Sequence, residues 1–219
     1  MNKEIQYKIY SGGYNNYLYT LIPENKKVLD VGCNTGYLGE KLIKDKKCTV
    51  YGIDYSKNAI DVAKKKLNYA KVFDLETYTL PFPNDKFDVI IFGDVLEHVR
   101  QPEKVLLLFK KMLNKDGIII SSIPNVANIN VRLSLLFGNW NYQQWGILDQ
   151  THLRFFTKKS IKKLFTENNY EIIDIHSTPG FHFIVLRYFK ILKYIAKMLC
   201  KVYPKLFALQ FIIIARSKK

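Results

Sequence analysis

The sequence predicts an α/β fold in which a parallel sheet carries helices on both faces. Two observations predict it. Short apolar runs alternate along the chain with longer segments in which apolar residues recur at helical spacing. Runs such as "FDVIIFG" are apolar almost throughout rather than at every second residue, which indicates strands that are buried on both faces. At 219 residues the chain can build one substantial core, so we expect a single domain over residues 1–219.

The first half of the chain supplies five of these strands and the helices between them. Two helices carry a local signal at their start. Ser56 stands where an N-cap would accept a backbone N–H, and Pro102 falls in a first turn, where a missing N–H costs nothing. The strands are expected at residues 26–32, 48–54, 70–74, 87–93 and 117–123, and the helices at 35–45, 56–68 and 101–114.

After the fifth strand the alternation stops. Residues 124–156 form a long, irregular and aromatic segment, where a connection of about 4–6 residues is usual. No repeat or Pro/Ser-rich linker marks a second domain, so we interpret this segment as an insertion. The remaining elements are a helix at 157–168, a strand at 170–177, a helical insertion at 181–203 and a last strand at 208–217.

Composition limits the classes of partner. The net charge is +15, but only five of the 34 basic residues are arginine, the usual reader of phosphates and guanine edges, so we expect no specific nucleic-acid binding. Three cysteines without metal-type spacing fit a reducing compartment. The start of the chain lacks a secretory pattern, and no apolar run approaches the roughly 20 residues that span a bilayer. We therefore expect a cytoplasmic protein.

The stretch "VLDVGCNTGYLGEKL" (28–42) indicates a cofactor site. Gly32 and Gly36, in the turn between a strand and a helix, let a ligand approach the backbone closely. Asp30, just before that turn, would repel a pyrophosphate and favour a ligand with positive charge. Alternatively, Asp30 is a structural acid that accepts backbone N–H groups of the turn.

Further acids follow the other strands, where ligands of open α/β sheets bind. Asp54 ends the second strand, where an acid can accept both ribose hydroxyls. Asp74 ends the third and could accept from an adenine amino group, while Gly93 and Asp94 end the fourth. An adenosine with a cationic tail fits this layout, which points to S-adenosylmethionine.

The motifs "VLDVGCNTG", "YGIDYS", "VFDLE" and "FDVIIFGDVLEHVRQPEKVL" resemble, in order, those of class I S-adenosylmethionine-dependent methyltransferases over residues 26–177. The resemblance implies a Rossmann-like sheet of seven strands whose last strand, "ALQFIIIARS", is antiparallel. It also implies the contacts with the cofactor. Gly32 and Gly36 would flank the methionine moiety, with Asp30 and Cys33 in the same loop, and Gly93 and Asp94 would lie near its amino group. Asp54 would bind the ribose, and the adenine would be bordered by Tyr55, Asp74 and Leu75.

Several acceptor classes are excluded by motifs that the sequence lacks. The fourth strand ends in "FGDVLEH", not in the Asn/Asp-Pro-Pro-aromatic tetrad of enzymes that methylate exocyclic amines. Neither a paired-glutamate loop of the arginine-methylating kind nor the acid cluster of magnesium-dependent catechol enzymes is present. We therefore expect a small-molecule or glycan acceptor and no metal site. The combination of "SGGYNN", "SIPN" and "DQTHLRFFT" resembles bacterial methyltransferases, some of them in glycan and cell-surface biosynthesis.

The insertion offers candidate catalytic residues within 138–156. His152 has a pKa range suited to a general base, with Asp149 as a possible orienting partner. In the alternative interpretation, Asp149 and Arg154 only pin the insertion to the sheet. His98, beside Glu97 at the end of the fourth strand, is a second candidate base. The aromatic residues Trp140, Tyr142 and Trp145 could pack on an apolar or sugar face of the acceptor.

Two further segments have two interpretations each. Residues 1–25 include "YSGGYNNY", which either closes over the cofactor as a lid, with Tyr14 near the methionine carboxylate, or is a surface turn. In 181–203, lysines and Arg187 share one side of a helix and apolar residues the other. That apolar side either covers the sheet or a second copy in a homodimer, or gives peripheral contact with anionic lipid at the inner membrane face.

We therefore expect an enzyme that O-methylates a sugar or other small hydroxylated acceptor. A methyltransferase for quinone-type or other aromatic acceptors is the first alternative, because the tryptophans suit an aromatic ring equally well. The second is a cofactor-binding subunit of a glycan-assembly complex that performs no chemistry.

Overall fold

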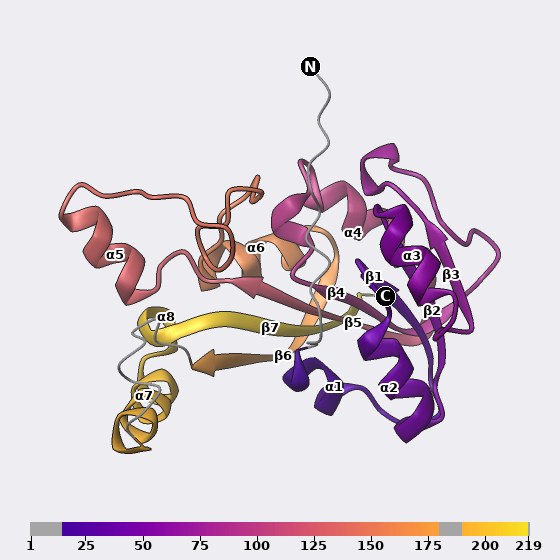
Figure 1. Ribbon diagram of the computed structural model, residues 1–219, viewed down its shortest axis with the longest axis horizontal. Helices are drawn as coiled ribbons and strands as arrows, with labels where there is room; N and C mark the ends of the chain where they lie inside the picture. The colour runs from indigo at the N-terminus through magenta and orange to yellow at the C-terminus, as the bar shows by residue number, and fades with distance from the viewer. Residues whose placement is uncertain (1–14, 180–189, 219) are drawn as a thin grey trace. The chain divides into compact units, whose positions relative to one another are not determined.

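The computed structural model describes residues 15–179 and 190–218 (Figure 1). The chain forms two compact units, which are described separately. The first comprises the chain up to Gly93 together with Leu108–Ile119, and the second comprises Asp94–Leu107 and the chain from Ile120 onward. Tyr14 and most of the predicted lid lie outside the described residues, as do residues 180–189 of the predicted insertion.

One seven-stranded sheet has the order β3-β2-β1-β4-β5-β7-β6, which confirms the predicted strand number. In the first unit β1 pairs in parallel with β2 and β4, and β2 pairs in parallel with β3. In the second unit β7 runs antiparallel to β6. The strands are β1 (Lys27–Val31), β2 (Thr49–Asp54), β3 (Tyr69–Val72), β4 (Phe87–Gly93), β5 (Leu113–Pro124), β6 (Tyr170–Pro179) and β7 (Ala208–Ser217).

Of the first unit's two longer helices, the one expected at 56–68 begins at the predicted N-cap, whereas the helix expected at 35–45 begins two residues late, at Tyr37. Ser56 caps α3 (Lys57–Ala63) by accepting the N–H of Ala59 at 3.3 Å. The helix α2 (Tyr37–Lys46) follows the glycine turn, and a Cβ at its N-cap Gly36 would lie 3.3 Å from Ala63 of α3. A short helix, α1 (Asn16–Leu21), was not predicted, because one turn and a half is too short to show helical periodicity. Its Leu18 is buried.

Two predicted helix ends are wrong. The helix expected at 101–114 is α4 (Pro102–Lys110), and β5 already begins at Leu113. A turn ends the helix after Lys110. The Met112 carbonyl then accepts the N–H of Phe87, the first residue of β4, so Met112 is already paired with the sheet. The helix expected at 56–68 ends at Ala63 and continues only as turns. Leu67 and Met112 fit the helical spacing of their predicted helices, but turns in the backbone place these two residues in the core instead.

The insertion at 124–156 is not irregular throughout, as the sequence had suggested. It contains α5 (Ile129–Leu136), whose N-cap Asn128 accepts the N–H of Asn130 at 3.0 Å. It also has a small apolar core of its own. That core consists of Val131, Ile147 and Leu148, with Val126, Trp140, Phe155 and Leu209 packed against them.

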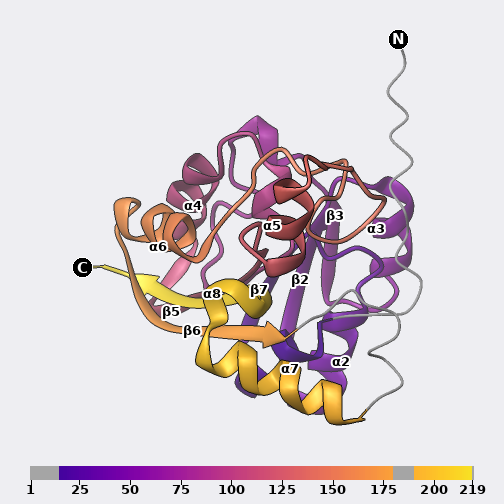
Figure 2. The ribbon, with the colours of Figure 1, turned by 90° about the vertical axis from the view of Figure 1, so that its left-hand side faces the viewer.

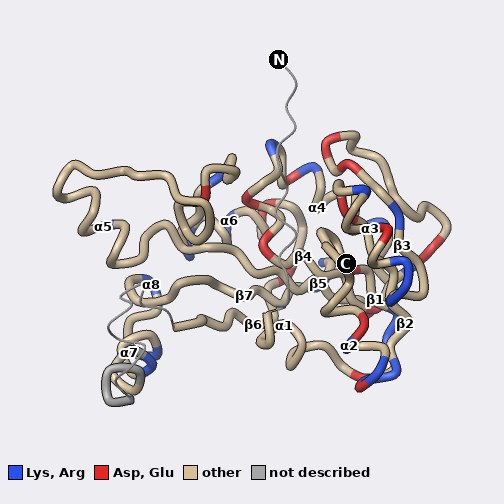
Figure 3. Tube along the Cα trace, in the orientation of Figure 1, with Lys and Arg blue, Asp and Glu red and all other residues tan. Residues whose placement is uncertain are grey.

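The end of the second unit brings β7 back beside β6. Along the chain, β6 is followed by α7 (Lys190–Val202) and α8 (Pro204–Phe207) before β7 begins. In space, α7 lies along β6 (Figure 2). The predicted helix at 157–168 is α6 (Lys158–Glu167), which starts in a capping box between Thr157 and Ser160. Cys200 of α7 is buried, and α7 carries basic but no acidic residues (Figure 3). None of the described helices is both long and apolar enough to cross a membrane.

Replacing Gly52 of β2 with alanine should destabilise the first unit. The added Cβ would lie 2.5 Å from Leu67 Cδ1 and 2.7 Å from Cys33 Sγ. Overpacking of this kind costs about 1–3 kcal/mol. Denaturant unfolding should show that loss for Gly52→Ala, while Thr49→Ala, at an exposed position of the same strand, changes stability by about 0.5 kcal/mol or less. Equal stability of Gly52→Ala and the wild type would contradict this packing.

Candidate functional site

The glycine loop between β1 and α2 lies on the end of β2. Three of its residues have positive φ: Gly32 at 73°, Asn34 at 49° and Gly36 at 77°. The N–H groups of Gly32 and Cys33 both donate to the Ile53 carbonyl, at 2.8 and 3.0 Å. This left-handed backbone is the reason for glycine at two of the three positions. A Cβ at Gly36 would also come within 3.1 Å of Leu67 Cγ.

The carboxylate of Asp54 joins two loops at this edge of the sheet. Its Oδ2 accepts the N–H of Asn34 in the glycine loop at 2.9 Å, and its Oδ1 accepts the N–H of Ser56 at 2.8 Å. The acid that holds the turn by its backbone is therefore Asp54, a role that the sequence had left open for Asp30. The next residue, Tyr55, is exposed.

Asp30 is buried beneath the glycine loop. Burial, together with the nearby charge of Asp54, raises the pKa of the Asp30 carboxyl to about 7. Burial likewise raises the pKa of the Cys33 thiol, so this cysteine is neutral and acts as a small apolar residue of the loop. An acid held with so high a pKa in the unliganded protein is suited to a cation, which would favour its charged form.

The ends of β3 and β4 lie at the same edge of the first unit, because the paired strands are parallel. Asp74 caps the short 3₁₀ helix η1 (Leu75–Thr77), and its Oδ1 accepts the N–H of Glu76 at 2.9 Å. Leu75 is half-buried beside it. At the end of β4, a Cβ on Gly93 would lie 3.1 Å from the buried Leu18 of α1.

In the second unit, Asp94 follows Gly93 with a positive φ of 54°. Its N–H donates to Ser122, and its Oδ1 accepts from Gln210 Nε2 at 2.7 Å. Burial raises the pKa of the Asp94 carboxyl to about 6, although the hydrogen bonds from Ser122 and Gln210 act in the opposite direction.

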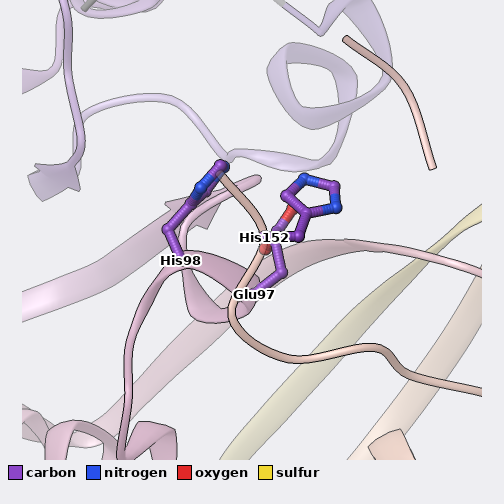
Figure 4. Close-up of side chains that lie close together, drawn as sticks. All are labelled: Glu97, His98 and His152. Carbon is purple, nitrogen blue, oxygen red and sulfur yellow. The ribbon is translucent and has the colours of Figure 1, made fainter. Parts of the chain in front are cut away.

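The turn after Asp94, the 3₁₀ helix η2 (Leu96–His98), brings Glu97 and His98 beside His152 of the insertion (Figure 4). The Glu97 carbonyl accepts the N–H groups of Leu153 and Arg154, at 2.8 and 3.0 Å. These bonds fix the insertion to η2. One donor atom from each of Glu97, His98 and His152 lies within 4.8 Å of the other two.

The Glu97 side chain is the most unusual group of this cluster. It is only 1% exposed, and neither carboxylate oxygen has a hydrogen-bond partner among the described residues. Burial, and then the charge of Asp94, raise the pKa of Glu97 well above its ordinary value. Sequence reasoning did not assign Glu97 a role, because its only signal was its position next to His98.

Both histidines are neutral and have a defined tautomer. His152 Nδ1 lies 3.1 Å from the Ile147 carbonyl, and His98 Nδ1 lies 3.2 Å from that of Thr151. A carbonyl can only accept, so each Nδ1 carries the proton and each Nε2 the lone pair. Burial lowers the pKa of both imidazoles, and their rings are 4.8 Å apart.

Asp149 does not contact His152 as its predicted orienting partner. Its Oδ1 accepts the N–H of Thr151 at 2.8 Å and the Thr151 hydroxyl at 2.6 Å. Because that hydroxyl proton is donated to Asp149, Thr151 Oγ1 can only accept from His98 Nδ1, 3.2 Å away. Asp149 thus orients His98 through Thr151. The Nδ1 of His152 instead lies 3.1 Å from the Ile147 carbonyl, and the charge of Asp149 raises the pKa of this imidazole.

The remaining candidates of the insertion have structural positions. Arg154 donates through Nε and Nη2 to the Arg100 carbonyl, at 3.0 and 2.6 Å, which pins the insertion as the alternative interpretation expected. Trp140 packs in the small core, whereas Tyr142 and Trp145 are 59% and 57% exposed. Of these three aromatic residues, Trp140 belongs to the core, and Tyr142 and Trp145 are accessible to a ligand.

Comparisons with known proteins agree with this fold. Residues 3–175 match the family described as "Methyltransferase domain". An uncharacterised methyltransferase of Anoxybacillus flavithermus is 34% identical over 118 residues, 52% of this chain and 55% of that protein. A ubiquinone biosynthesis O-methyltransferase of Pasteurella multocida is 35% identical over 114 residues, 46% of this chain and 47% of that protein. A crystal structure of an S-adenosylmethionine-dependent methyltransferase from Archaeoglobus fulgidus has a TM-score of 0.66 and 17% identity, covering 92% of this chain and 90% of that one.

The chain spans about half the length of the first curated relatives that it matches. The solved structure shares the fold at low identity. The family match is broader and runs from the predicted lid to β6. On this ground, the chain belongs to the family of class I S-adenosylmethionine-dependent methyltransferases.

Proposed function

We propose that the protein transfers the methyl group of S-adenosylmethionine to a hydroxyl oxygen of a small acceptor. The observation that carries this proposal is the pair of neutral histidines, His98 and His152, each with Nδ1 held by a carbonyl. His98 comes five residues after Gly93, the end of β4. An oxygen nucleophile that carries a proton needs a base, and a neutral imidazole with a free lone pair is suited to that task.

The cofactor-binding role is assigned to the edge of the first unit. The left-handed glycine loop and the buried acid Asp30 fit a ligand that approaches the backbone and carries positive charge. Asp54 has oxygen lone pairs left for ribose hydroxyls, and Tyr55, Asp74 and Leu75 would border the adenine. When bound, S-adenosylmethionine supplies an electrophilic methyl group on a sulfonium with a neutral leaving group.

The chain's own residues would prepare the acceptor. His152 Nε2 takes the hydroxyl proton while the acceptor oxygen forms its bond to the methyl carbon. The carbon–sulfur bond breaks with its electron pair on sulfur, so the products are a methyl ether, neutral S-adenosylhomocysteine and a protonated imidazole. Alignment of the acceptor can contribute about 7–11 kcal/mol in favourable cases. The exposed rings of Tyr142 and Trp145 would provide it by packing on the acceptor.

Two acceptor types fit this arrangement. A sugar or glycan hydroxyl was expected from the sequence, and a quinone-type phenol is favoured by relatives named ubiquinone biosynthesis O-methyltransferases. Radiolabelled S-adenosylmethionine with each acceptor class distinguishes them by the labelled product. A folded protein that binds the cofactor but labels no acceptor of either class would support the non-catalytic subunit instead.

A membrane-borne acceptor would give α7 a role at a lipid surface. Its described residues expose Tyr194, Met198 and Val202 on one side, beside Lys197 and Lys201. Contact with anionic headgroups through this face would follow from its charge and apolar surface. Co-sedimentation with anionic but not zwitterionic vesicles supports this role, and equal recovery with both excludes it.

Asp30→Asn should stabilise the unliganded protein and weaken cofactor binding. The folded pKa of about 7 exceeds the unfolded value near 3.8, so folded-state stability is lost as the pH rises from about 4 to about 7. At pH 8, Asp30→Asn should regain up to about 4 kcal/mol of that loss. It should bind S-adenosylmethionine about tenfold or more weakly, because the opposing charge is gone.

Thermal unfolding and calorimetry at pH 8 measure these two effects. Asp61→Asn is the control, because Asp61 is exposed on α3, and both quantities should stay at the wild-type value. A variant of Asp30 that is less stable than the wild type and binds the cofactor equally well would contradict the assignment.

His152→Asn should lower kcat by about 10²–10⁴-fold if His152 is the base. In the wild type, kcat should fall as acid protonates the imidazole, with a midpoint below the ordinary histidine pKa because burial lowers it. Asp149→Asn should move this midpoint further down, since the charge of Asp149 raises the pKa of both histidines. A pH profile that is identical in all three proteins would exclude this pair from proton transfer.

A further inference from the structure

We propose that Glu97, His98 and His152 form a binding site for one divalent transition-metal ion of the zinc type. The three residues come from two segments, η2 and the insertion, in which His98 and Thr151 lie 53 positions apart along the chain. They converge because the Glu97 carbonyl binds the N–H groups of Leu153 and Arg154. Ion binding itself does not depend on the proposed function, but the role given below does.

The histidines are prepared as ligands in the way that metal-binding histidines usually are. Such a histidine donates one ring N–H to a carbonyl or carboxylate, which leaves the other nitrogen for the ion. Here Ile147 and Thr151 supply those carbonyls, and the Nε2 lone pairs of both rings remain available. The Asp149–Thr151 hydrogen bonds add a further layer, because they prevent the Thr151 hydroxyl from donating to His98.

The third ligand is a buried carboxylate that has no hydrogen-bond partner in the part of the chain that the structure describes. Glu97 is 1% exposed, and both of its oxygens are without a hydrogen-bond partner among the described residues. Burying such a group is costly unless it is paired, protonated or bound to a metal. Asp94 and Asp149 make the surroundings more negative, since the charges of both raise the pKa of Glu97. A cation between Glu97 and the two imidazoles would relieve that cost.

The ligand types narrow the identity of the ion. Imidazole suits zinc, iron, nickel and copper, whereas magnesium and calcium prefer sites made of oxygen. Two histidines and one glutamate also form catalytic zinc sites, which leave a fourth position for water or substrate. Ligand atoms around tetrahedral zinc lie about 3.4 Å apart at bonds of about 2.1 Å. The present spacing, within 4.8 Å, therefore has to contract by side-chain rotation.

In the ion-bound protein, the open position would take the acceptor hydroxyl. A divalent ion lowers the pKa of a coordinated O–H group, so an ion held by Glu97, His98 and His152 would make the acceptor hydroxyl easier to deprotonate. His152 would then be a ligand rather than the base. This role deepens the proposed function and replaces only the means by which the acceptor is activated.

Equilibrium dialysis of the untagged, chelator-treated chain against Zn²⁺ tests the site without any acceptor. We expect about one tightly held ion per chain, and Co²⁺ in its place should give visible absorption bands of a low-symmetry site. Glu97→Gln and His152→Asn should each weaken Zn²⁺ binding by about 100-fold or more. Thermal unfolding of both variants shows whether they are folded.

His176→Ala is the matched control, because His176 lies on β6 beside Asp174 and is not a member of the Glu97, His98 and His152 group. It should bind Zn²⁺ as the wild type does. Failure of the wild type to bind Zn²⁺, or equal binding by folded Glu97→Gln, would overturn the inference. Either result would leave the proposed function intact with His152 as base, whereas ion binding without methyl transfer to any acceptor would remove only the proposed function.

Discussion

The first unit depends on one shared carboxylate. Asp54 accepts an N–H from the glycine loop after β1 and another from the turn that starts α3. These bonds hold two strand-to-helix connections in register at the carboxyl edge of a parallel sheet, where the paired strands β1 and β2 both end. For the loop to make these contacts, several of its residues, among them Asn34, adopt the left-handed backbone conformation. An acid at this position therefore builds the loop at the sheet edge to which the cofactor-binding role is assigned.

Buried acids are the second constraint. Asp30, Asp94 and Glu97 all have a raised pKa, and burial is the first cause in each case. They differ in how far hydrogen bonds from the protein offset the cost of burying each carboxyl group. The Asp94 carboxylate accepts a hydrogen bond from Gln210 Nε2, and hydrogen bonding with Ser122 and Gln210 partly offsets the effect of burial on its pKa. The Glu97 side chain, in contrast, has no hydrogen-bond partner among the described residues. Strongly shifted acids of this kind are frequent where a cation or a proton is handled, which is the basis of the roles proposed for them.

Much of the fold, and the placing of the acids at the strand ends, can be predicted from local sequence patterns. The strands are apolar runs, Ser56 is an N-cap, and the acids at strand ends follow from the parallel sheet. Helix ends are harder, because the apolar residues near Met112 fit helical spacing while their backbone turns toward β4. The Glu97–His152 cluster could not be predicted, since no local signal reveals that two segments far apart in sequence are joined by main-chain hydrogen bonds. The hydrogen-bonded link from Asp149 through Thr151 to His98 could not be predicted for the same reason.

The measurement that tests the account most directly is calorimetry of S-adenosylmethionine binding to the wild type, Asp54→Ala and the exposed-site control Asp61→Ala. Loss of the Asp54 carboxylate removes both the loop contact and the proposed ribose contact. Binding of S-adenosylmethionine to Asp54→Ala should therefore fall below detection, while Asp61→Ala binds it as the wild type does. Thermal unfolding shows whether the Asp54 variant is folded. A folded Asp54→Ala that binds the cofactor as tightly as the wild type, or a folded wild type that does not bind it, would contradict the account.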